Sequence, residues 1–391
     1  MFKILTLNNI AVAGLRRLPR ERYEVATEIG HPDAILLRSQ NMHDMEIPET
    51  VAAIGRAGAG TNNIPVEQMS ARGVPVFNAP GANANAVKEL VIAGMLIATR
   101  NLCRASEYVS SLKESGDALE KAVEAGKKQF VGCELPGKTL GVVGLGAIGV
   151  QVANSALALG MRVVGFDPAI TVRSAWQLSS GVQHVDTLDQ LFQNADFVTL
   201  HVPLLDATRN LVSGERIRLM NDGGTLINFA RGGIVDDAAV IAALDSGKLH
   251  AFVSDFPTPE LIAHRKAVVF PHLGASTAEA EENCAIMVAD NVRDYLENGN
   301  IRYAVNFPDA RMPRADAWRI TIANANVPNM VGQISTLIAN AGLNIEDLLN
   351  KSLGGLAYTI VDVNAEPSQE LLDAIRAING ILTLRNLGKP V

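Results

Sequence analysis

Three segments of this chain carry ionisable side chains directly after apolar runs that predict buried strands. They are residues 228–236, 255–260 and 271–277, and they contain Arg231, Glu260 and His272. In open α/β sheets, ligands bind beyond the carboxyl ends of the strands. We therefore expect these three side chains to converge on one crevice.

The three residue types suit the removal of a hydride from a secondary alcohol. The hydroxyl proton must leave as the hydride departs, and a histidine such as His272, with an ordinary pKa of about 6.5, accepts it well near neutral pH. A carboxylate at Glu260 would orient the imidazole and favour its protonated form. Arg231 would offer two parallel N–H donors to a substrate carboxylate. Taken singly, each residue also fits a structural or solvated position, so the interpretation depends on all three together.

A glycine-rich turn predicts where the hydride acceptor binds. Gly144, Gly146 and Gly149 follow the apolar run 140–143 and precede an apolar helical stretch. Gly144 permits a tight turn, Gly146 lets backbone N–H groups approach a pyrophosphate, and Gly149 lets the helix lie close to the sheet. Asp167, after the next predicted strand, would bind the adenosine ribose and repel a 2′-phosphate. The pattern therefore predicts NAD rather than NADP.

His201 is the competing candidate for the base. It lies in the sequence Leu-His-Val-Pro, after the apolar run that begins at residue 197. We expect it to line the nicotinamide side of the cofactor rather than to accept the proton.

Strands and helices alternate along most of the chain, which predicts the α/β class with doubly wound parallel sheets. Long apolar helices are expected at residues 85–100 and 277–298, and the polar segment 107–128 is expected to cross between domains. We predict a discontinuous substrate-binding domain and a Rossmann domain for NAD. Their expected bounds are residues 1–98 with 289–310, and residues 99–288.

The last part of the chain has a different pattern. Residues 308–316 are rich in charge and proline and read as a linker. Residues 318–391 then show the order strand, helix, strand, strand, helix, strand. This order predicts a small ferredoxin-like domain.

Composition restricts the class of protein and of partner. The chain has 391 residues, of which 48% are hydrophobic and 19% charged, with a net charge of −7. This balance indicates a soluble globular protein with a small-molecule partner and argues against nucleic acid or anionic membranes. No apolar run reaches the roughly 18 residues of a membrane span, and no leader pattern is seen. The three separated cysteines predict neither a disulfide framework nor a metal site, which fits the cytoplasm.

Six motifs together resemble the D-isomer-specific 2-hydroxyacid dehydrogenase family, in family order and over almost the entire length. They are residues 55–63, 77–83, 144–149, 201–203, 228–237 and 271–277. The chain is most similar to the members that act on 3-phosphoglycerate and carry a C-terminal ACT domain. The resemblance implies NAD-dependent oxidation of 3-phospho-D-glycerate to 3-phosphooxypyruvate, the first step of L-serine biosynthesis.

The resemblance also implies roles for individual residues. Arg231 would bind the substrate carboxylate and polarise the carbonyl, His272 would be the acid/base, and Glu260 its partner. The implied cofactor-binding residues are Gly144, Gly146, Ala147, Ile148, Gly149, Asp167, His201, Val202, Pro203, Thr208, Asn228, Ala230, Asp255, His272 and Gly274. The implied substrate-binding residues are Arg38, Ser39, Arg56, Gly58, Asn78, Lys88, Arg231 and His272. The chain departs from the family pattern where Phe256 directly follows Asp255 and where Leu261 follows Glu260.

The C-terminal segment resembles ACT domains, which bind amino acids and control biosynthetic enzymes. Asn326 and Asn344 match the stretches that hold serine in regulated members, so L-serine is the effector that the resemblance implies. Asn324 and Asn329 depart from the pattern, standing where histidine and glycine are usual. The alternative is a domain that only joins subunits. A homodimer or homotetramer is expected in either case.

Two other functions remain open at this stage. A glyoxylate or hydroxypyruvate reductase of the same family would have little use for an amino-acid-binding domain. An NAD-sensing binding protein similar to the transcriptional corepressors of this fold would keep the same residues without turnover.

Overall fold

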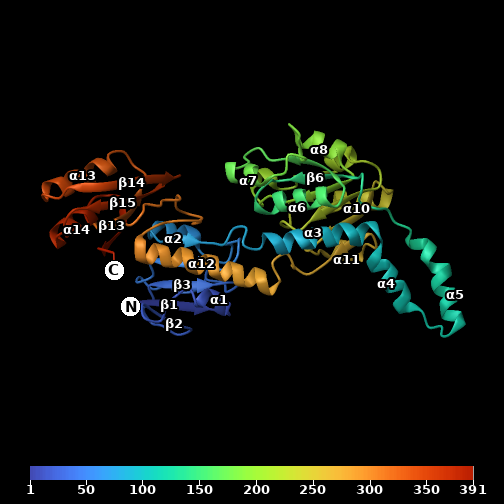
Figure 1. Ribbon diagram of the computed structural model, residues 1–391, viewed down its shortest axis with the longest axis horizontal. Coiled ribbons are helices and arrows are strands. Elements are labelled where there is room, and N and C mark those ends of the chain that lie inside the picture. The colour runs from blue at the N-terminus through green and yellow to red at the C-terminus, as the bar shows by residue number, and fades with distance from the viewer. Residues whose placement is uncertain (391) are drawn as a thin grey trace. The chain divides into compact units, whose positions relative to one another are not determined.

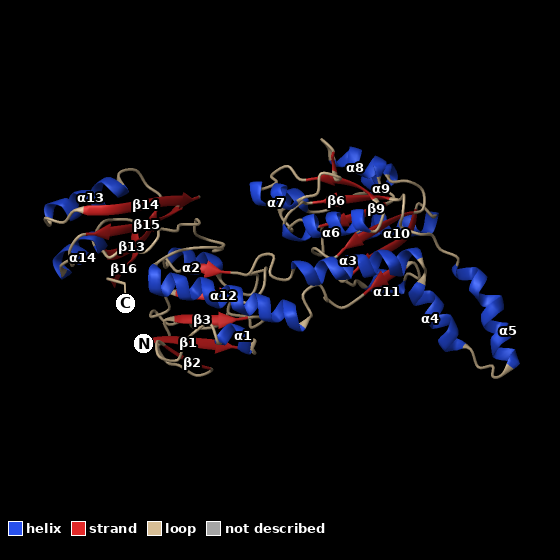
Figure 2. Cartoon of the chain, in the orientation of Figure 1, coloured by secondary structure: helices blue, strands red, loops and turns tan. Residues whose placement is uncertain are grey.

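Three sheets form the framework of residues 1–390 (Figure 1). The computed structural model describes residues 1–390. It separates them into two units, one formed by residues 1–82 together with the residues from 278 onward, and one formed by residues 83–277. The alternation of strands and helices is visible in both units in Figure 2.

The first unit begins with a five-stranded parallel sheet. Its order is β2-β1-β3-β4-β5, with β1 Phe2–Leu7, β2 Tyr23–Ala26, β3 Ala34–Leu37, β4 Ala53–Arg56 and β5 Val76–Phe77. Its helices are α1 Val12–Leu15, α2 Val66–Ala71 and the long α12 Ala278–Asn298. Glycines allow α12 to lie close, because a Cβ at Gly14 would stand 2.6 Å from Ala285, and one at Gly55 would stand 2.8 Å from Val288. The helix α12 therefore packs directly on α1 and β4.

The second unit is built on a seven-stranded parallel sheet. Its order is β12-β11-β10-β9-β6-β7-β8. The strands are β6 Thr139–Val143, β7 Arg162–Phe166, β8 Gln183–His184, β9 Phe197–Leu200, β10 Gly224–Asn228, β11 Leu249–Ser254 and β12 Ala267–Val269. The helices are α3 Ala84–Thr99, α6 Ala147–Ala158, α7 Val172–Gln177, α8 Leu188–Asn194, α9 Gly214–Leu219, α10 Asp237–Ser246 and α11 Pro259–Ala263, with a 3-10 turn at Asp206–Thr208. The strand order reverses between β6 and β9, which is where dinucleotides bind in this type of sheet.

Residues 101–130 form a helical hairpin, so the expectation that residues 107–128 cross between domains was wrong. The hairpin consists of α4 Leu102–Ser111, α5 Asp117–Gly126 and a 3-10 turn Lys127–Phe130, and it extends away from the sheet of its unit (Figure 1). The Tyr108 ring packs 5.5 Å from the Phe130 ring, and its hydroxyl donates to the Ala122 carbonyl at 2.8 Å. These contacts hold the helices to each other.

The C-terminal part of the first unit is an antiparallel module, and its element order confirms the predicted ferredoxin-like arrangement. The elements are β13 Trp318–Ala325, α13 Met330–Asn340, β14 Ile345–Leu353, β15 Leu356–Val363, α14 Gln369–Arg376 and β16 Ile381–Gly388. The sheet order is β14-β15-β13-β16. One face packs under α13 and α14, with Ile320, Ile334 and Val361 wholly buried.

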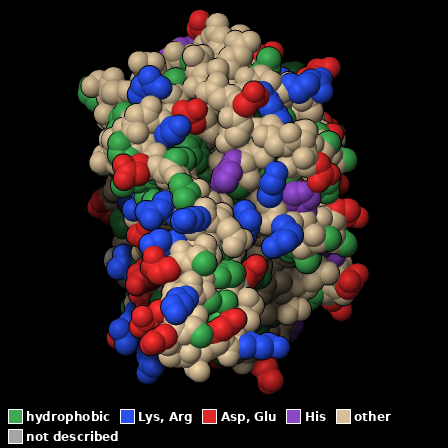
Figure 3. Space-filling view, turned by 90° about the vertical axis from the view of Figure 1, so that its right-hand side faces the viewer, with side chains coloured by type: hydrophobic (Ala, Val, Ile, Leu, Met, Phe, Trp, Pro, Cys, Tyr) green, Lys and Arg blue, Asp and Glu red, His purple; other side chains and the backbone are tan. Residues whose placement is uncertain are grey.

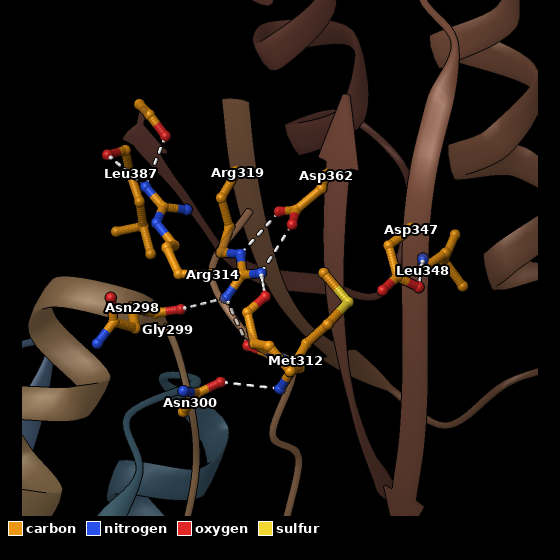
Figure 4. A network of polar contacts seen from close by, with 12 residues as sticks. Asn298, Gly299, Asn300, Met312, Arg314, Arg319, Asp347, Leu348, Asp362 and Leu387 are labelled. Atoms are coloured by element: carbon orange, nitrogen blue, oxygen red, sulfur yellow. Dashed lines mark hydrogen bonds and ion pairs between the residues drawn. The ribbon is translucent and has the colours of Figure 1, made fainter. Parts of the chain in front are cut away.

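The other face of the module packs on the end of α12 and on the linker through a buried arginine (Figure 4). Arg319 is 0% exposed and forms two hydrogen bonds of 2.7 Å to the carboxylate of Asp362. It also donates to three backbone carbonyls, those of Asn298, Met312 and Pro313. One guanidinium therefore ties the end of α12, the linker and the module sheet together.

The unit boundaries differ from those predicted from the sequence. The structure divides the chain at residues 82/83 and 277/278 rather than at 98/99 and 288/289. The helix α3 packs on α6, β10 and β11, so it belongs to the second unit. The helix α12 packs on α1 and β4, so it belongs wholly to the first.

Charged side chains of both signs lie on the face that Figure 3 displays. Lys, Arg, Asp and Glu side chains are intermingled on this face, with hydrophobic groups among them. Within residues 1–390, no helix is both long and apolar enough to cross a bilayer.

Substituting Arg319 is expected to unfold the module preferentially. Arg319→Met leaves the Asp362 carboxylate, 1% exposed, without the guanidinium that binds both of its oxygens, which should cost about 3–5 kcal/mol. The measurement is urea unfolding followed by Trp318 fluorescence in a Trp176→Phe background, since Trp176 is 85% exposed. Arg376→Met removes the exposed pair with Asp373 and should cost less than about 1 kcal/mol. Equal losses in the two variants would contradict the structural role of Arg319.

Candidate active site

The turn between β6 and α6 has the geometry of a pyrophosphate cradle. Gly144 has a φ of +91°, and a Cβ there would stand 2.6 Å from the carbonyl oxygen of His201. A Cβ at Gly149 would overlap the carbonyl oxygen of Gly144. Gly146 differs, because a Cβ there would meet nothing within 4 Å. Gly144 and Gly149 thus allow close packing of the backbone. Gly146 leaves open space at the N-terminus of α6, where an anion is favoured.

Asp167 is fixed beside this turn. Its Oδ2 accepts the Leu145 N–H at 2.8 Å, and its Oδ1 accepts the Ala169 N–H at 2.9 Å. The carboxylate therefore lies between the end of β7 and the glycine turn. The open space at Gly146 and the placement of Asp167 together fit a dinucleotide with an unmodified ribose.

Other residues expected at the cofactor lie on the loop after β9. The Thr208 hydroxyl donates to the Pro203 carbonyl at 2.6 Å and accepts the Leu205 N–H at 2.7 Å, which closes the loop. His201 forms a 3.0 Å hydrogen bond with Thr199 through Nε2, and burial lowers its pKa to about 3. A histidine with so low a pKa is a weak proton acceptor at pH 7, which does not favour His201 as the base.

Arg231, Asp255 and His272 follow three adjacent strands, β10, β11 and β12. A cavity of about 380 Å³ lies at this edge of the sheet. Its lining includes Asn228, Gly232, Asp255, Phe256 and His272. The Asn228 amide donates to the Arg231 carbonyl at 2.9 Å, which fixes the start of the arginine loop. The structure thus brings the loops of Arg231 and His272 to the same edge of one sheet.

Asp255 holds the loop that carries His272. Its side chain is 1% exposed, and Oδ2 accepts the backbone N–H groups of Leu273 at 2.9 Å and Gly274 at 3.0 Å. Burial raises the pKa of this carboxyl, although the Gly274 hydrogen bond opposes the shift. Its Oδ1 is buried without a partner among the described residues, as expected of an oxygen that accepts a hydrogen bond from a bound ligand. The sequence assigned Asp255 to the cofactor but did not predict that its carboxylate also fixes the loop of His272.

The surroundings of His272 differ from the expected pairing. Its ring lies 4.9 Å from the Phe256 ring at 57°, a contact that sequence reasoning missed, although the departure at Phe256 marked the position. Glu260 is exposed in the first turn of α11, and within residues 1–390 no hydrogen bond or ion pair joins it to His272. Burial raises the pKa of Asp237, and the charge of Glu260 adds to the shift. The role of Glu260 as the partner of His272 stays a prediction.

In the first unit, the expected substrate residues lie at the carboxyl ends of neighbouring strands. Arg38 and Ser39 follow β3, Arg56 ends β4 and Asn78 follows β5. The Arg56 Nε donates to the Arg38 carbonyl at 3.1 Å, and Nη1 of Arg38 lies 2.7 Å from Oε1 of Glu281. A Cβ at Gly58 would overlap the Arg56 guanidinium.

Two further expected substrate residues have polar partners of their own. The Asn78 amide donates to the Ala59 carbonyl at 2.6 Å, and the Tyr303 carbonyl accepts the Asn78 N–H at 3.1 Å. Lys88 belongs to the second unit, where its Nζ donates to Asn85 at 2.6 Å.

The two expected effector residues lie at opposite ends of the module sheet. The Asn326 N–H donates to the Gly355 carbonyl, beside the turn between β14 and β15. Asn344 precedes β14, whose first residue pairs with Val363 at the far end of β15. One copy of the chain therefore cannot bring Asn326 and Asn344 to one small ligand. Within residues 1–390, no group of three or more His, Cys, Asp or Glu side chains could hold a metal ion.

Alanine at Gly146 is expected to impair dinucleotide binding without loss of stability. Its Cβ would enter the space expected for the pyrophosphate, and one lost hydrogen bond weakens binding about tenfold. NAD titration by calorimetry and thermal unfolding of the free protein measure the two effects. Gly149→Ala is the matched control, because its Cβ overlaps the Gly144 carbonyl and should lower the unfolding temperature. Unchanged NAD affinity in Gly146→Ala would contradict this placement of the pyrophosphate.

Comparisons with known proteins agree with this geometry. Residues 92–274 match the family model described as D-isomer specific 2-hydroxyacid dehydrogenase, NAD binding domain. A D-3-phosphoglycerate dehydrogenase of Methanocaldococcus jannaschii is 35% identical over 335 residues, covering 83% of this chain and 61% of that protein. A hydroxypyruvate reductase of Thermotoga maritima is 38% identical over 284 residues, covering 70% of this chain and 87% of that protein.

A solved structure supports the same assignment. The NAD+-bound 3-phosphoglycerate dehydrogenase of Entamoeba histolytica is similar with a TM-score of 0.60 and 26% identity, covering 78% of this chain and 98% of that one. The predicted α/β fold and the predicted NAD cofactor are confirmed. This chain spans less than two thirds of the length of the Methanocaldococcus protein. The chain belongs to the D-isomer-specific 2-hydroxyacid dehydrogenase family.

Proposed function

We propose that this chain catalyses the NAD-dependent oxidation of 3-phospho-D-glycerate to 3-phosphooxypyruvate. The observation that carries the proposal is the meeting of the Arg231 and His272 loops at one edge of a sheet that also bears an NAD-type glycine turn. The similarity to D-3-phosphoglycerate dehydrogenases supports the choice of substrate.

In this proposal each side chain acts on a defined part of the reaction. Bound NAD supplies the hydride acceptor. His272 accepts the hydroxyl proton of the substrate through a ring nitrogen, while Asp255 holds its loop through two backbone N–H groups. Arg231 binds the substrate carboxylate and places a donor near the reacting oxygen. Arg38 and Arg56 supply positive charge for the phosphate.

A hydroxypyruvate reductase is the second candidate, favoured by two observations. The Thermotoga relative carries that name, and Arg38 is already paired with a carboxylate. A cofactor-sensing protein without turnover is the third candidate. Only substrate-dependent formation of NADH separates an enzyme from such a protein.

Turnover should favour 3-phosphoglycerate over D-lactate, D-glycerate and 2-hydroxyglutarate, and it should depend on His272. Loss of a general base typically costs about 10²–10⁴-fold in rate, so His272→Asn should lower kcat by that range while NAD still binds. The measurement is NADH absorbance with each acid. His31→Asn, an exposed histidine of the first unit, should leave kcat unchanged. A preference for an unphosphorylated acid would overturn the substrate, and full activity of His272→Asn would overturn the mechanism.

We also propose that the module binds L-serine between two copies of the chain. The strand β14 is a sheet edge, so antiparallel pairing of two β14 strands would bring Asn344 of one copy toward the Asn326 loop of the other. Asn324, 1% exposed, lies near this loop at the end of β13 and has a buried Oδ1 without a partner among the described residues.

Serine should therefore raise the unfolding temperature of an oligomer, and Asn344→Ala should abolish that shift. Light scattering gives the mass, and a thermal scan with L-serine gives the shift. D-serine is the control ligand. A monomer in solution, or a shift that persists in Asn344→Ala, would contradict a site shared between copies.

A further inference from the structure

Arg38, one of the two arginines proposed to bind the substrate phosphate, forms an ion pair with a carboxylate of its own unit. Glu281 lies in the first turn of α12, and its Oε1 is 2.7 Å from Nη1 of Arg38, which follows β3. The two side chains are 42% and 36% exposed. Water and ligands can therefore reach this ion pair, unlike the buried pair of Arg319 and Asp362.

The surrounding contacts show that Glu281, Arg38 and Arg56 form one charge cluster. The Arg56 Nε donates to the Arg38 carbonyl, and the Arg56 guanidinium lies over Gly58. Cys284 lies one turn farther along α12, close enough for all three charges to affect the pKa of its thiol. Burial is the main cause of the raised pKa. The cluster carries two positive charges and one negative charge, so its net charge is about half of what the arginines alone would give.

A ligand group that approaches Arg38 therefore also comes close to the carboxylate of Glu281. A phosphate dianion competes with the carboxylate for the same guanidinium and is repelled by it at short range. A neutral hydroxyl meets no such penalty, because it can donate to the carboxylate and accept from the guanidinium. The pair thus distinguishes the two kinds of distal group by charge.

We propose that Glu281 is a specificity-determining residue for the distal group of the substrate. It holds Arg38 when no anion is present, and it lowers the affinity of this site for a phosphate relative to a hydroxyl. This inference rests on the proposed function, since it places the substrate phosphate at Arg38 and Arg56. Glu281 takes no part in proton or hydride transfer, so its effect is on binding rather than on the chemical step.

The test is Glu281→Gln, which keeps the shape of the side chain and removes its charge. We expect KM for 3-phosphoglycerate to fall about tenfold, with kcat within about twofold and KM for D-glycerate unchanged. Glu282→Gln, the exposed neighbouring residue, removes one charge from the same helix and should change none of these values. If the ratio of kcat/KM for the two acids is the same in Glu281→Gln as in the wild type, Glu281 does not determine specificity.

A binding measurement separates this inference from the proposed reaction. Calorimetric titration of 3-phosphoglycerate into the protein with NADH present requires no turnover. Glu281→Gln should tighten this binding about tenfold. The gain from the same change in an Arg38→Gln background should be smaller, because only the direct repulsion is then removed. Failure of the proposed reaction would appear as no NADH formation from 3-phosphoglycerate. Failure of this inference would appear as unchanged affinity, or as the same gain without Arg38.

Discussion

The carboxylate of Asp255 is the constraint on which the candidate site depends. Asp255 directly follows β11, and one oxygen of its carboxylate accepts two successive backbone N–H groups from the loop after β12. A buried acceptor of this kind costs free energy unless it is satisfied, so the two N–H groups fix the path of the loop. The position of His272 follows from that path. The second oxygen, buried without a partner among the described residues, is left for a donor from outside the chain.

The sequence was a good guide to elements with strong patterns. Apolar runs located β6 to within one residue and the first residue of β9, and apolar spacing located α3 and α12. It missed the short strand β2, where only Tyr23 is buried, and the two-residue strand β8, where both residues are exposed. These strands have too few buried side chains to produce an apolar pattern in the sequence. The unit boundaries were missed for a related reason, since periodicity shows that a helix has an apolar face but not which sheet that face covers.

Sequence reasoning about the site succeeded for positions after strands and failed for contacts between side chains. The parallel order of β10, β11 and β12 follows from buried strands joined by helices, so the loops of Arg231 and His272 could be placed at one edge. The ring contact of His272 with Phe256 depends on the local path of two loops. The position of Glu260, whose charge helps to raise the pKa of Asp237, depends on a local loop path in the same way. No spacing rule encodes such paths, and the departure at Phe256 was the one available signal.

Two of the arginine–carboxylate pairs of the first unit, Arg319 with Asp362 and Arg38 with Glu281, show why burial decides what an ion pair does. Arg319 and Asp362 have no access to solvent and also satisfy backbone carbonyls, so no ligand can exchange with either partner. Arg38 and Glu281 have the same shortest separation, 2.7 Å, but more than a third of each side chain is exposed. An exposed pair contributes little to folding because water competes with it. For the same reason an arriving anion can replace the carboxylate, which makes the exposed pair suited to selecting ligands and the buried pair suited to holding the module in place.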